Sequence, residues 1–388
     1  MTNDEKPKSS RKINRRLLGL LFSLASLAGL IYIAITLITG GDLGLRSLTN
    51  LFATRTPDAV AEELDFNVGR ERVFAHLDGA VASVGTLGIQ VLDLAGNETL
   101  SDPFRMTRPA IKSAAGSAIA FDIGGTQVRV FDNSQIAASI EASGAIVSAS
   151  INTNGWFCVS TQGSAGLRGV ATVYNDQGRA VYRVNLVTGY VLSAVLSHDN
   201  SDLAVLSLTD VGSRLAFYKG MSEENPDFEF NFTGELILDM HYLPSGELLA
   251  ISTDTLFMVN RNGEYRELYR FSGGQLRGYI LDGSFTVLYL LDYGVGYLGR
   301  LVTLDDDGTP LGEYTTDRVL ISMSYSDGTL AVLKSDGLSF YDAELQETLA
   351  AGEQMSLAGV NNIIALGDGV ALAAGDHSAI LFRKLPDS

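Results

Sequence analysis

The chain has 388 residues, enough for two or three ordinary domains or for one large domain built of repeats. Apolar residues make up 46% of it and charged residues 19%, which argues against a largely disordered chain because a sizeable core can form. The formal net charge is −17. An acidic protein lacks the attraction to phosphate groups that drives nucleic-acid binding, so nucleic acid is not an expected partner.

The first 38 residues have the pattern of a membrane anchor. Residues 1–16 form a basic tail with six Lys or Arg against two acidic residues, which leaves −21 for the rest of the chain. Leu17–Ile38 then contains 22 residues and no charge. At about 1.5 Å per residue it spans about 33 Å, enough for a bilayer core of about 30 Å. We therefore expect 1–16 to be a basic tail and 17–38 a transmembrane helix.

The basic residues also predict the orientation of this helix. Six Lys or Arg precede it, whereas only Arg46 and Arg55 follow closely. The positive-inside rule then places the N-terminus in the cytoplasm and the rest outside, so we expect a single-pass protein of the cell membrane. A cleaved signal peptide is the alternative. Its apolar region is normally about 7–15 residues and ends at a small-x-small site, which Thr39–Asp42 does not offer.

Residues 39–61 are expected to be a tether between the helix and a globular domain at 62–388. The tether contains Leu43, Leu45, Leu48, Leu51 and Phe52. This spacing fits either a short amphipathic helix at the membrane surface or a plain linker, and both interpretations stay open.

A unit of about 41 residues recurs after residue 72. Each copy contains an apolar run, a short polar or glycine turn and a second apolar run that commonly ends in Asp or Asn. The second runs end at residues 93, 132, 175, 219, 260, 305, 342 and 383. Such a unit reads as a hairpin, and the spacing leaves room for two further strands. Four strands per unit of about 40 residues is typical of a propeller blade.

We therefore predict an all-β fold: a β-propeller of about eight four-stranded blades, with seven as the alternative. Many runs are apolar at consecutive positions, as expected of strands buried on both faces. The last unit lacks residues for a fourth strand. Glu62–Val68 alternates apolar and polar residues and is expected to supply that strand, which would close the ring and remove a free sheet edge.

Two sequence motifs suggest chemistry but fit the repeat better. Asp122-Ile123-Gly124-Gly125-Thr126 is similar to the first phosphate-binding turn of the sugar-kinase and actin superfamily. Its flanks are strands of the repeat instead of an α/β domain, so a blade hairpin is expected. Asp305-Asp306-Asp307-Gly308 suggests calcium, but the EF-hand spacing fails, which favours an acidic β-turn.

The remaining reactive side chains form no pattern of a known site. Cys158 is the only cysteine and lies in an apolar run, so we expect a small buried side chain. The four histidines, His76, His198, His241 and His377, show no metal-binding spacing. We predict no catalytic, cofactor-binding or metal residues, and no cofactor. Propellers do assemble sites from distant blades, so histidine chemistry stays an alternative.

The layout of basic tail, anchor, tether and weak repeats resembles an uncharacterised family of membrane-anchored propellers of unknown function in Gram-positive bacteria. Its repeats are similar to WD40 and quinoprotein repeats, although the chain has one tryptophan, Trp156, and lacks the tryptophan motif of quinoproteins. The resemblance implies no catalytic residues. We expect a scaffold that binds a protein or an envelope polymer. The alternative is a hydrolase or lyase acting on envelope glycans with carboxylates in the propeller channel.

Overall fold

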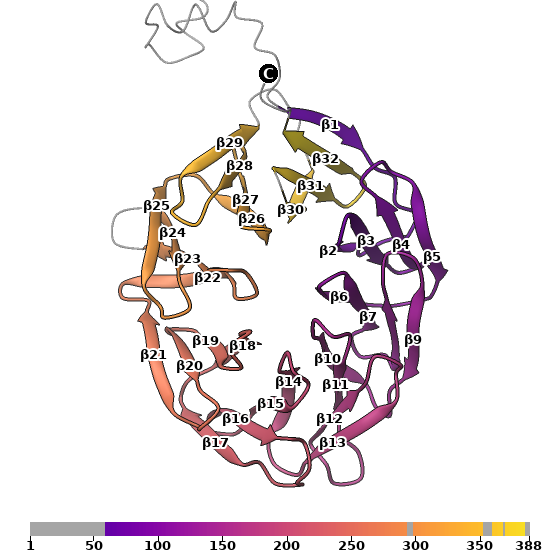
Figure 1. Ribbon diagram of the computed structural model, residues 1–388, viewed down its shortest axis with the longest axis vertical. Helices are drawn as coiled ribbons and strands as arrows, with labels where there is room; N and C mark the ends of the chain where they lie inside the picture. Colours follow the sequence, from indigo (N-terminus) through magenta and orange to yellow (C-terminus); the bar gives the residue numbers. More distant parts are fainter. Residues whose placement is uncertain (1–58, 293–297, 352–358, 368, 385–388) are drawn as a thin grey trace, which may run out of the picture. The chain divides into compact units, whose positions relative to one another are not determined.

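The computed structural model describes residues 59–292, 298–351, 359–367 and 369–384. These residues form 32 β-strands in eight antiparallel sheets of four strands, and no helix occurs among them. The sheets are arranged as blades around one axis, with the first strand of each blade innermost (Figure 1). The prediction of an all-β propeller with eight four-stranded blades is confirmed, and the alternative of seven blades is wrong.

The first four blades follow the chain in order. Blade 1 contains β2 (Val73–Leu77), β3 (Ala80–Gly85), β4 (Gly88–Asp93) and β5 (Glu98–Pro103). Blade 2 contains β6 (Pro109–Ala114), β7 (Ser117–Asp122), β8 (Gln127–Phe131) and β9 (Ile136–Glu141). Blade 3 contains β10 (Ile146–Ile151), β11 (Phe157–Gln162), β12 (Gly169–Tyr174) and β13 (Ala180–Leu186). Blade 4 contains β14 (Tyr190–Leu196), β15 (Asp202–Leu208), β16 (Gly212–Lys219) and β17 (Phe228–Thr233).

The last four blades complete the ring. Blade 5 contains β18 (Ile237–Tyr242), β19 (Leu248–Ser252), β20 (Thr255–Val259) and β21 (Tyr265–Arg270). Blade 6 contains β22 (Gly274–Ile280), β23 (Thr286–Asp292), β24 (Leu298–Leu304) and β25 (Pro310–Thr316). Blade 7 contains β26 (Leu320–Ser326), β27 (Thr329–Lys334), β28 (Gly337–Tyr341) and β29 (Glu347–Ala351). Blade 8 contains β30 (Val360–Ala365), β31 (Val370–Gly375), β32 (Ala379–Lys384) and β1 (Ala59–Glu63).

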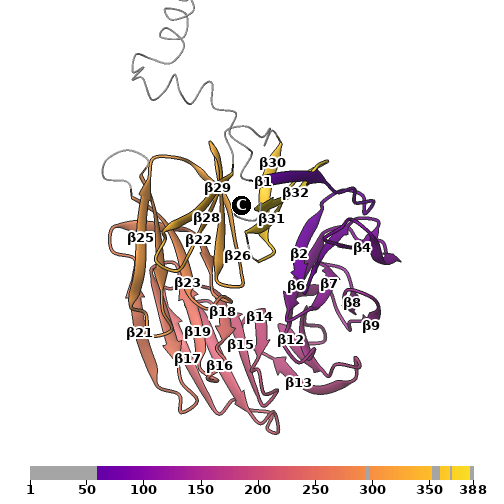
Figure 2. The same ribbon diagram turned by 45° about the horizontal axis from the view of Figure 1, so that its top comes forward.

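The meander in each blade divides the loops between the two faces of the ring. We call one face apical: it carries the loops from each outer strand to the next inner strand and those between second and third strands. We call the other face basal: it carries the loops between first and second and between third and fourth strands. Every outer strand therefore runs from the basal to the apical face. The blades stand side by side in the tilted view (Figure 2).

The repeated hairpin consists of the second and third strands of each blade. The third strands end at Asp93, Phe131, Tyr174, Lys219, Val259, Leu304, Tyr341 and Lys384, within one residue of the positions expected from the repeat. Second strands such as β3 and β19 are buried at every position, whereas the outer strand β5 is exposed at alternate positions. Neighbouring blades cover both faces of the second and third strands, so consecutive apolar residues are required there.

The hydrophobic core lies in the seams between blades. One cluster joins Cys158 and Val173 of blade 3 to Leu203 and Val205 of blade 4, and all four side chains are completely buried. Seven further clusters each join the described residues of neighbouring blades in the same way. Full burial of one such aliphatic side chain contributes about 1.5–3 kcal/mol, so the ring is held by seams instead of a single core.

The ring is closed by the N-terminal strand, but not by the residues expected. β1 pairs with β32 from Ala59↔Lys384 to Glu63↔Ile380. The predicted strand Glu62–Val68 is therefore wrong in position: only its first two residues belong to β1. The alternation of Leu64, Phe66 and Val68 has another cause, because these side chains are buried in the seam between blades 8 and 1. They fill a seam after the strand has ended.

The transmembrane prediction is not tested by the fold. In the part of the chain that the structure describes, no helix could span a bilayer. The segment expected to do so, 17–38, lies outside the described residues, as do the basic tail and the tether up to residue 58.

Candidate interaction face

Exposed large apolar side chains gather on the apical face. Eleven such side chains are exposed among the described residues. Eight lie in apical loops or within the first two residues of an inner strand that begins there: Leu87, Val187, Tyr190, Val211, Leu236, Leu238, Val319 and Ile321. The other three, Val181, Tyr265 and Leu311, lie within the first two residues of outer strands, which begin on the basal face. Among the apical eight, Leu236 with Leu238 and Val319 with Ile321 are close neighbours in the chain at blade junctions, and neighbouring exposed apolar side chains are a feature of interaction sites.

The two faces differ as much in charge as in apolarity. The described basal loops contain 16 Asp and Glu but only two cations, Arg179 and Arg261, a net charge of −14. The described apical loops contain eight Asp and Glu and six Arg, a net charge of −2. Most of the negative charge of the propeller is therefore on its basal face. The apical face is nearly neutral and carries the apolar side chains.

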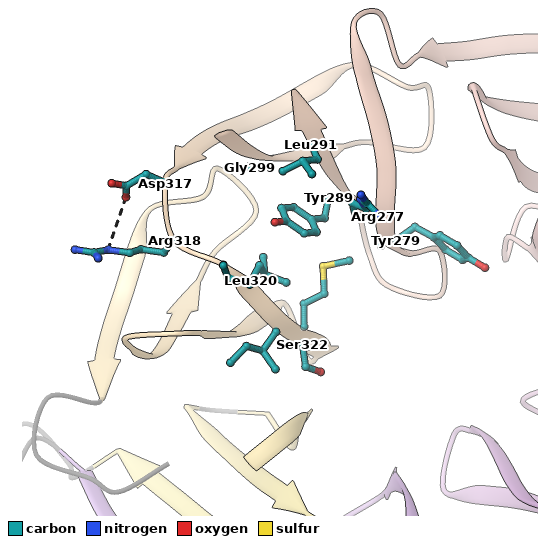
Figure 3. A pocket seen from close by; sticks show the side chains of 13 residues that line it. Arg277, Tyr279, Tyr289, Leu291, Gly299, Asp317, Arg318, Leu320 and Ser322 are labelled. Carbon is teal, nitrogen blue, oxygen red and sulfur yellow. Dashed lines mark ion pairs between the residues drawn. The ribbon is translucent and has the colours of Figure 1, made fainter. Parts of the chain in front are cut away.

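A cavity of about 620 Å³ lies between blades 6 and 7, near the apical face. Figure 3 shows Tyr289 and Leu291 of blade 6 on one side and Leu320 of blade 7 on the other. Val319 is 64% exposed and Ile321 is 44% exposed at this cavity. The volume of the cavity lies in the range of sites that bind a small ligand, and its lining is apolar, as is common in such sites.

Two glycines shape the wall of this cavity. A Cβ atom at Gly299 would lie 2.9 Å from a ring carbon of Tyr289, and one at Gly278 would lie 3.0 Å from the terminal methyl of Met323. The two glycines thus leave room for those side chains in the seam. At the mouth, the Arg318 guanidinium pairs with Asp336 at 3.1 Å and with Asp317 at 3.7 Å.

A second cavity, of about 420 Å³, lies between blades 5 and 6. Its lining includes Leu238 of β18, Leu276 of β22 and Asp254 of the apical loop between β19 and β20. Leu238 is 44% exposed. The apical face therefore offers two consecutive hollows at blade junctions, each beside an exposed aliphatic side chain.

The structure brings two of the four histidines together at the basal end of blades 4 and 5. The rings of His198 and His241 have centroids 6.0 Å apart. His198 Nε2 lies 2.8 Å from the carbonyl oxygen of Tyr242, and its Nδ1 lies 3.0 Å from Thr153 Oγ1. Because a carbonyl oxygen only accepts, Nε2 is the donor in the contact with Tyr242. Burial lowers the pKa of His241, partly opposed by Asp282.

The other two histidines lie apart from this pair. His76, at the basal end of β2, has its Nδ1 at 3.2 Å from Ser326 Oγ of blade 7. His377 lies in an exposed apical loop of blade 8. Within the described residues, no three His, Cys, Asp or Glu side chains are grouped as a metal site would require.

The alternative function, a hydrolase or lyase acting on glycans, requires carboxylates in the propeller channel, near its axis. The described inner strands contain one carboxylate, Asp239 of β18. Burial, with Asp239 next in importance, raises the pKa of the Tyr279 phenol on the neighbouring blade. Most glycosidases need two carboxylates that flank the bond to be cleaved. The inner strands do not supply such a pair.

The acidic and glycine motifs are turns of the repeat, as expected. Asp305 Oδ1 accepts the backbone N–H groups of Asp307 at 3.0 Å and Thr309 at 2.7 Å. Asp122 ends β7 and accepts the backbone N–H of Arg108 at 2.7 Å, and Gly124 lies in the hairpin that follows. Their carboxylates satisfy backbone donors of the blades. Neither motif has the surroundings of a calcium or phosphate site.

Cys158 is completely buried in β11, which confirms the prediction of a small core side chain. Burial raises the pKa of its thiol far above the ordinary value. A thiol without thiolate character in the core is chemically inert.

Sequence reasoning missed the apical residues. Val211, Leu236 and Val319 stand in short loops beside charged or glycine residues, where an apolar side chain gains nothing from the blade core. An apolar residue in a loop position of the repeat was the signal that could have found them.

Comparison with known families and structures fits this fold. Residues 55–350 match the family of unknown function DUF5711. The chain belongs to this family. No curated protein matches it. Among solved structures, the C-terminal WD40 domain of Sif2 aligns with a TM-score of 0.61 at 13% identity, over 84% of this chain and 99% of that one.

The Myceliophteria thermophila Cps50 (Swd1) β-propeller domain also aligns, with a TM-score of 0.46 and 14% identity. That alignment covers 71% of this chain and 96% of the other. At this identity, the likeness to the Sif2 domain establishes that this DUF5711 member has a WD40-like propeller fold. Fold alone does not establish function.

Proposed function

We propose that this DUF5711 protein is a membrane-anchored binding module whose apical face holds a protein partner outside the cell. The observation that supports the proposal is the gathering of eight exposed large apolar side chains, with two hollows, on one face. Aliphatic side chains exposed in loops weaken solubility without stabilising the blades, so a partner that covers them explains their presence. Propellers of the WD40 kind commonly bind proteins, an analogy at the level of fold.

The position of β1 is consistent with a free apical face. Outer strands begin on the basal face, so the chain reaches the propeller there, at Ala59 of blade 8. The first described residue therefore lies on the face opposite the apical loops.

An envelope polymer is the alternative to a protein as the partner of the apical face. Apolar side chains in shallow hollows fit polypeptide better than a highly hydrated anionic polymer, because such a polymer would bury charge against aliphatic groups. We therefore favour a protein partner.

Chemical crosslinking of the full chain in its own membranes tests the proposal. The double variant Leu236→Arg and Val319→Arg places two charges in the apical surface. Its matched control, Ser222→Arg and Asn262→Arg, places two at exposed basal positions with the same change in net charge. We expect the adducts formed by the unchanged protein to be lost in the apical variant and kept in the basal one. Adducts that survive in the apical variant, or that are lost only in the basal one, would refute the proposal.

A further inference from the structure

The apical loops of blades 4 to 6 are joined into a continuous platform. The carbonyl oxygen of Val211 accepts the N–H of Gly234 at 2.7 Å. The carbonyl oxygen of Leu236 accepts the N–H of Thr253 at 3.2 Å, and that of Asp254 accepts the N–H of Phe271 at 2.9 Å. Each loop is thus hydrogen-bonded to the next. Side chains on such a platform keep their relative positions, which lowers the entropy lost on binding.

Close backbone packing makes the platform rigid at its centre. Gly212, directly after Val211, has φ +146°, and a Cβ atom there would lie 2.0 Å from the carbonyl oxygen of Phe232. No residue with a side chain fits this approach. The loop that presents Asp210 and Val211 is therefore pressed against the loop that presents Glu235 and Leu236.

Each exposed apolar group on this platform stands beside a carboxylate. Asp210 precedes Val211, Glu235 precedes Leu236, and Asp254 lines the second cavity together with Leu238. Val211 is 52% exposed and Leu236 is 47% exposed. We call Asp210, Val211, Glu235, Leu236, Leu238 and Asp254 the apical strip.

The carboxylates of the apical strip form no close ion pair with another described residue. Arg270 bonds to Glu267 and interacts with Glu235 only at longer range. Three negative charges that lack a directly bonded cation and stand beside aliphatic side chains form a surface complementary to a partner with the opposite charge and similar apolarity.

We propose that the apical strip binds a basic, apolar segment of a partner polypeptide. Aliphatic side chains of that segment cover Val211, Leu236 and Leu238, and one enters the cavity of about 420 Å³ between blades 5 and 6. Lys or Arg side chains at alternate positions meet the three carboxylates. This inference rests on the proposed function and adds the chemistry of the partner.

The basal face does not offer the same combination, although it is more acidic. Several of its carboxylates accept backbone N–H groups of their own turns, as Asp132, Asp305 and Asp342 do. Three exposed large apolar side chains, Val181, Tyr265 and Leu311, stand singly at the basal ends of outer strands in three different blades, and no other lies near a described basal loop. Basic groups would meet charge there but only isolated apolar side chains.

Fluorescence anisotropy with synthetic peptides tests this inference on the full chain in phosphatidylcholine nanodiscs. The probe is a short labelled peptide of alternating Leu and Lys. The isosteric variant Asp210→Asn, Glu235→Gln and Asp254→Asn removes the strip charges. We expect it to weaken binding of the probe by about tenfold, the summed effect of three exposed ion pairs. The basal variant Glu223→Gln, Glu224→Gln and Glu344→Gln, with the same change in charge, should stay within twofold.

Two further probes separate charge from apolarity. A peptide of alternating Leu and Glu and one of alternating Ser and Lys should each bind far more weakly than the Leu and Lys probe. The inference is overturned if the Leu and Glu peptide binds as tightly, or if both triple variants weaken binding equally. Should Leu236→Arg with Val319→Arg abolish crosslinking while the strip charges have no effect, the interaction face would stand and only the basic partner would be refuted.

Discussion

The backbone N–H of Leu64 donates a hydrogen bond of 2.8 Å to the carbonyl oxygen of Ala379, joining opposite ends of the described chain. This bond continues the pairing of β1 with β32 and leads the chain into the seam between blades 8 and 1. Closure of the ring therefore depends on a strand and on the three apolar residues that follow it.

Loss of the seam side chains should destabilise the whole propeller. Phe66 is 7% exposed and packs edge to face on Phe74 at 5.4 Å between centroids. We expect Phe66→Ala to lower the free energy of unfolding by about 3–5 kcal/mol, because it leaves a cavity in a seam that closes the ring. Urea unfolding measures the change. Asp65→Ala, at an exposed neighbour, should stay within about 0.5 kcal/mol, and an equal loss in both variants would contradict the role of the seam.

The repeated Asp and Asn should be exchangeable with each other but not with Ala. Asn175 and Asn260 accept the same pair of backbone N–H groups in their turns as Asp305 does. We expect Asp305→Asn to be nearly neutral and Asp305→Ala to cost about 1 kcal/mol, since only Ala leaves the two donors without their acceptor. Thermal unfolding should show no stabilisation by calcium. A calcium-dependent rise in Tm that Asp305→Asn removes would contradict the turn role.

The two cavity glycines should differ in how they tolerate a methyl group. Gly299→Ala presses on the ring of Tyr289, which is rigid, and should cost about 1–3 kcal/mol of stability. Gly278→Ala presses on the end of the flexible Met323 side chain and should cost less, because methionine adapts. Chemical denaturation of both variants decides this. Equal costs would show that the wall of the cavity adapts at Tyr289 as well.

Acidification should destabilise the propeller through its half-buried histidines, His76 and His241. Burial is the main cause that lowers the pKa of His241, opposed by Asp282 and Asp239 and aided by His198 and Lys112. Burial also lowers the pKa of His76, opposed by Asp327 and Asp78. A folded-state pKa below the ordinary value of about 6.5 means that the unfolded chain binds more protons as the pH falls through that value. Stability is therefore greatest above it and declines below.

The size of this decline is bounded by the number of protons taken up. Each histidine contributes at most about 1.4 kcal/mol per pH unit. We expect the slope of unfolding free energy between pH 7 and 5 to be smaller in His241→Gln than in the unchanged protein. Measurement at pH 8, where histidine is neutral, separates lost packing from the loss of titration. Identical slopes in the two proteins would show that His241 does not titrate on unfolding.

Membrane attachment should survive high salt. The uncharged run 17–38 would be held by apolar burial in hydrocarbon, which salt does not screen. We expect the protein to sediment with membranes after a wash in concentrated salt, and added protease to digest the propeller in intact, wall-stripped cells while sparing residues 1–16. A mature form beginning near residue 40 in the medium would favour the signal-peptide alternative.

The sequence by itself indicated about eight blades and left seven as an alternative. Runs ending in Asp93, Asp132, Asn175, Asn260, Asp305 and Asp342 mark the turn after the third strand in six blades, where a side-chain oxygen accepts one or two backbone N–H groups. Second and third strands without alternation indicated burial on both faces. Both signals are local and recur in most blades, so they can be read without knowing which strands pair.

Only the tertiary structure decided which distant residues meet. Leu64, Phe66 and Val68 are alternately buried, as the pattern predicted, but they fill a seam instead of pairing in a ladder, and alternation records burial without naming the partner. Likewise, Val211, Leu236 and Val319 are isolated apolar residues in the sequence. They share one face because every blade turns the same way, so the candidate interaction face exists only once the meanders are stacked into a ring.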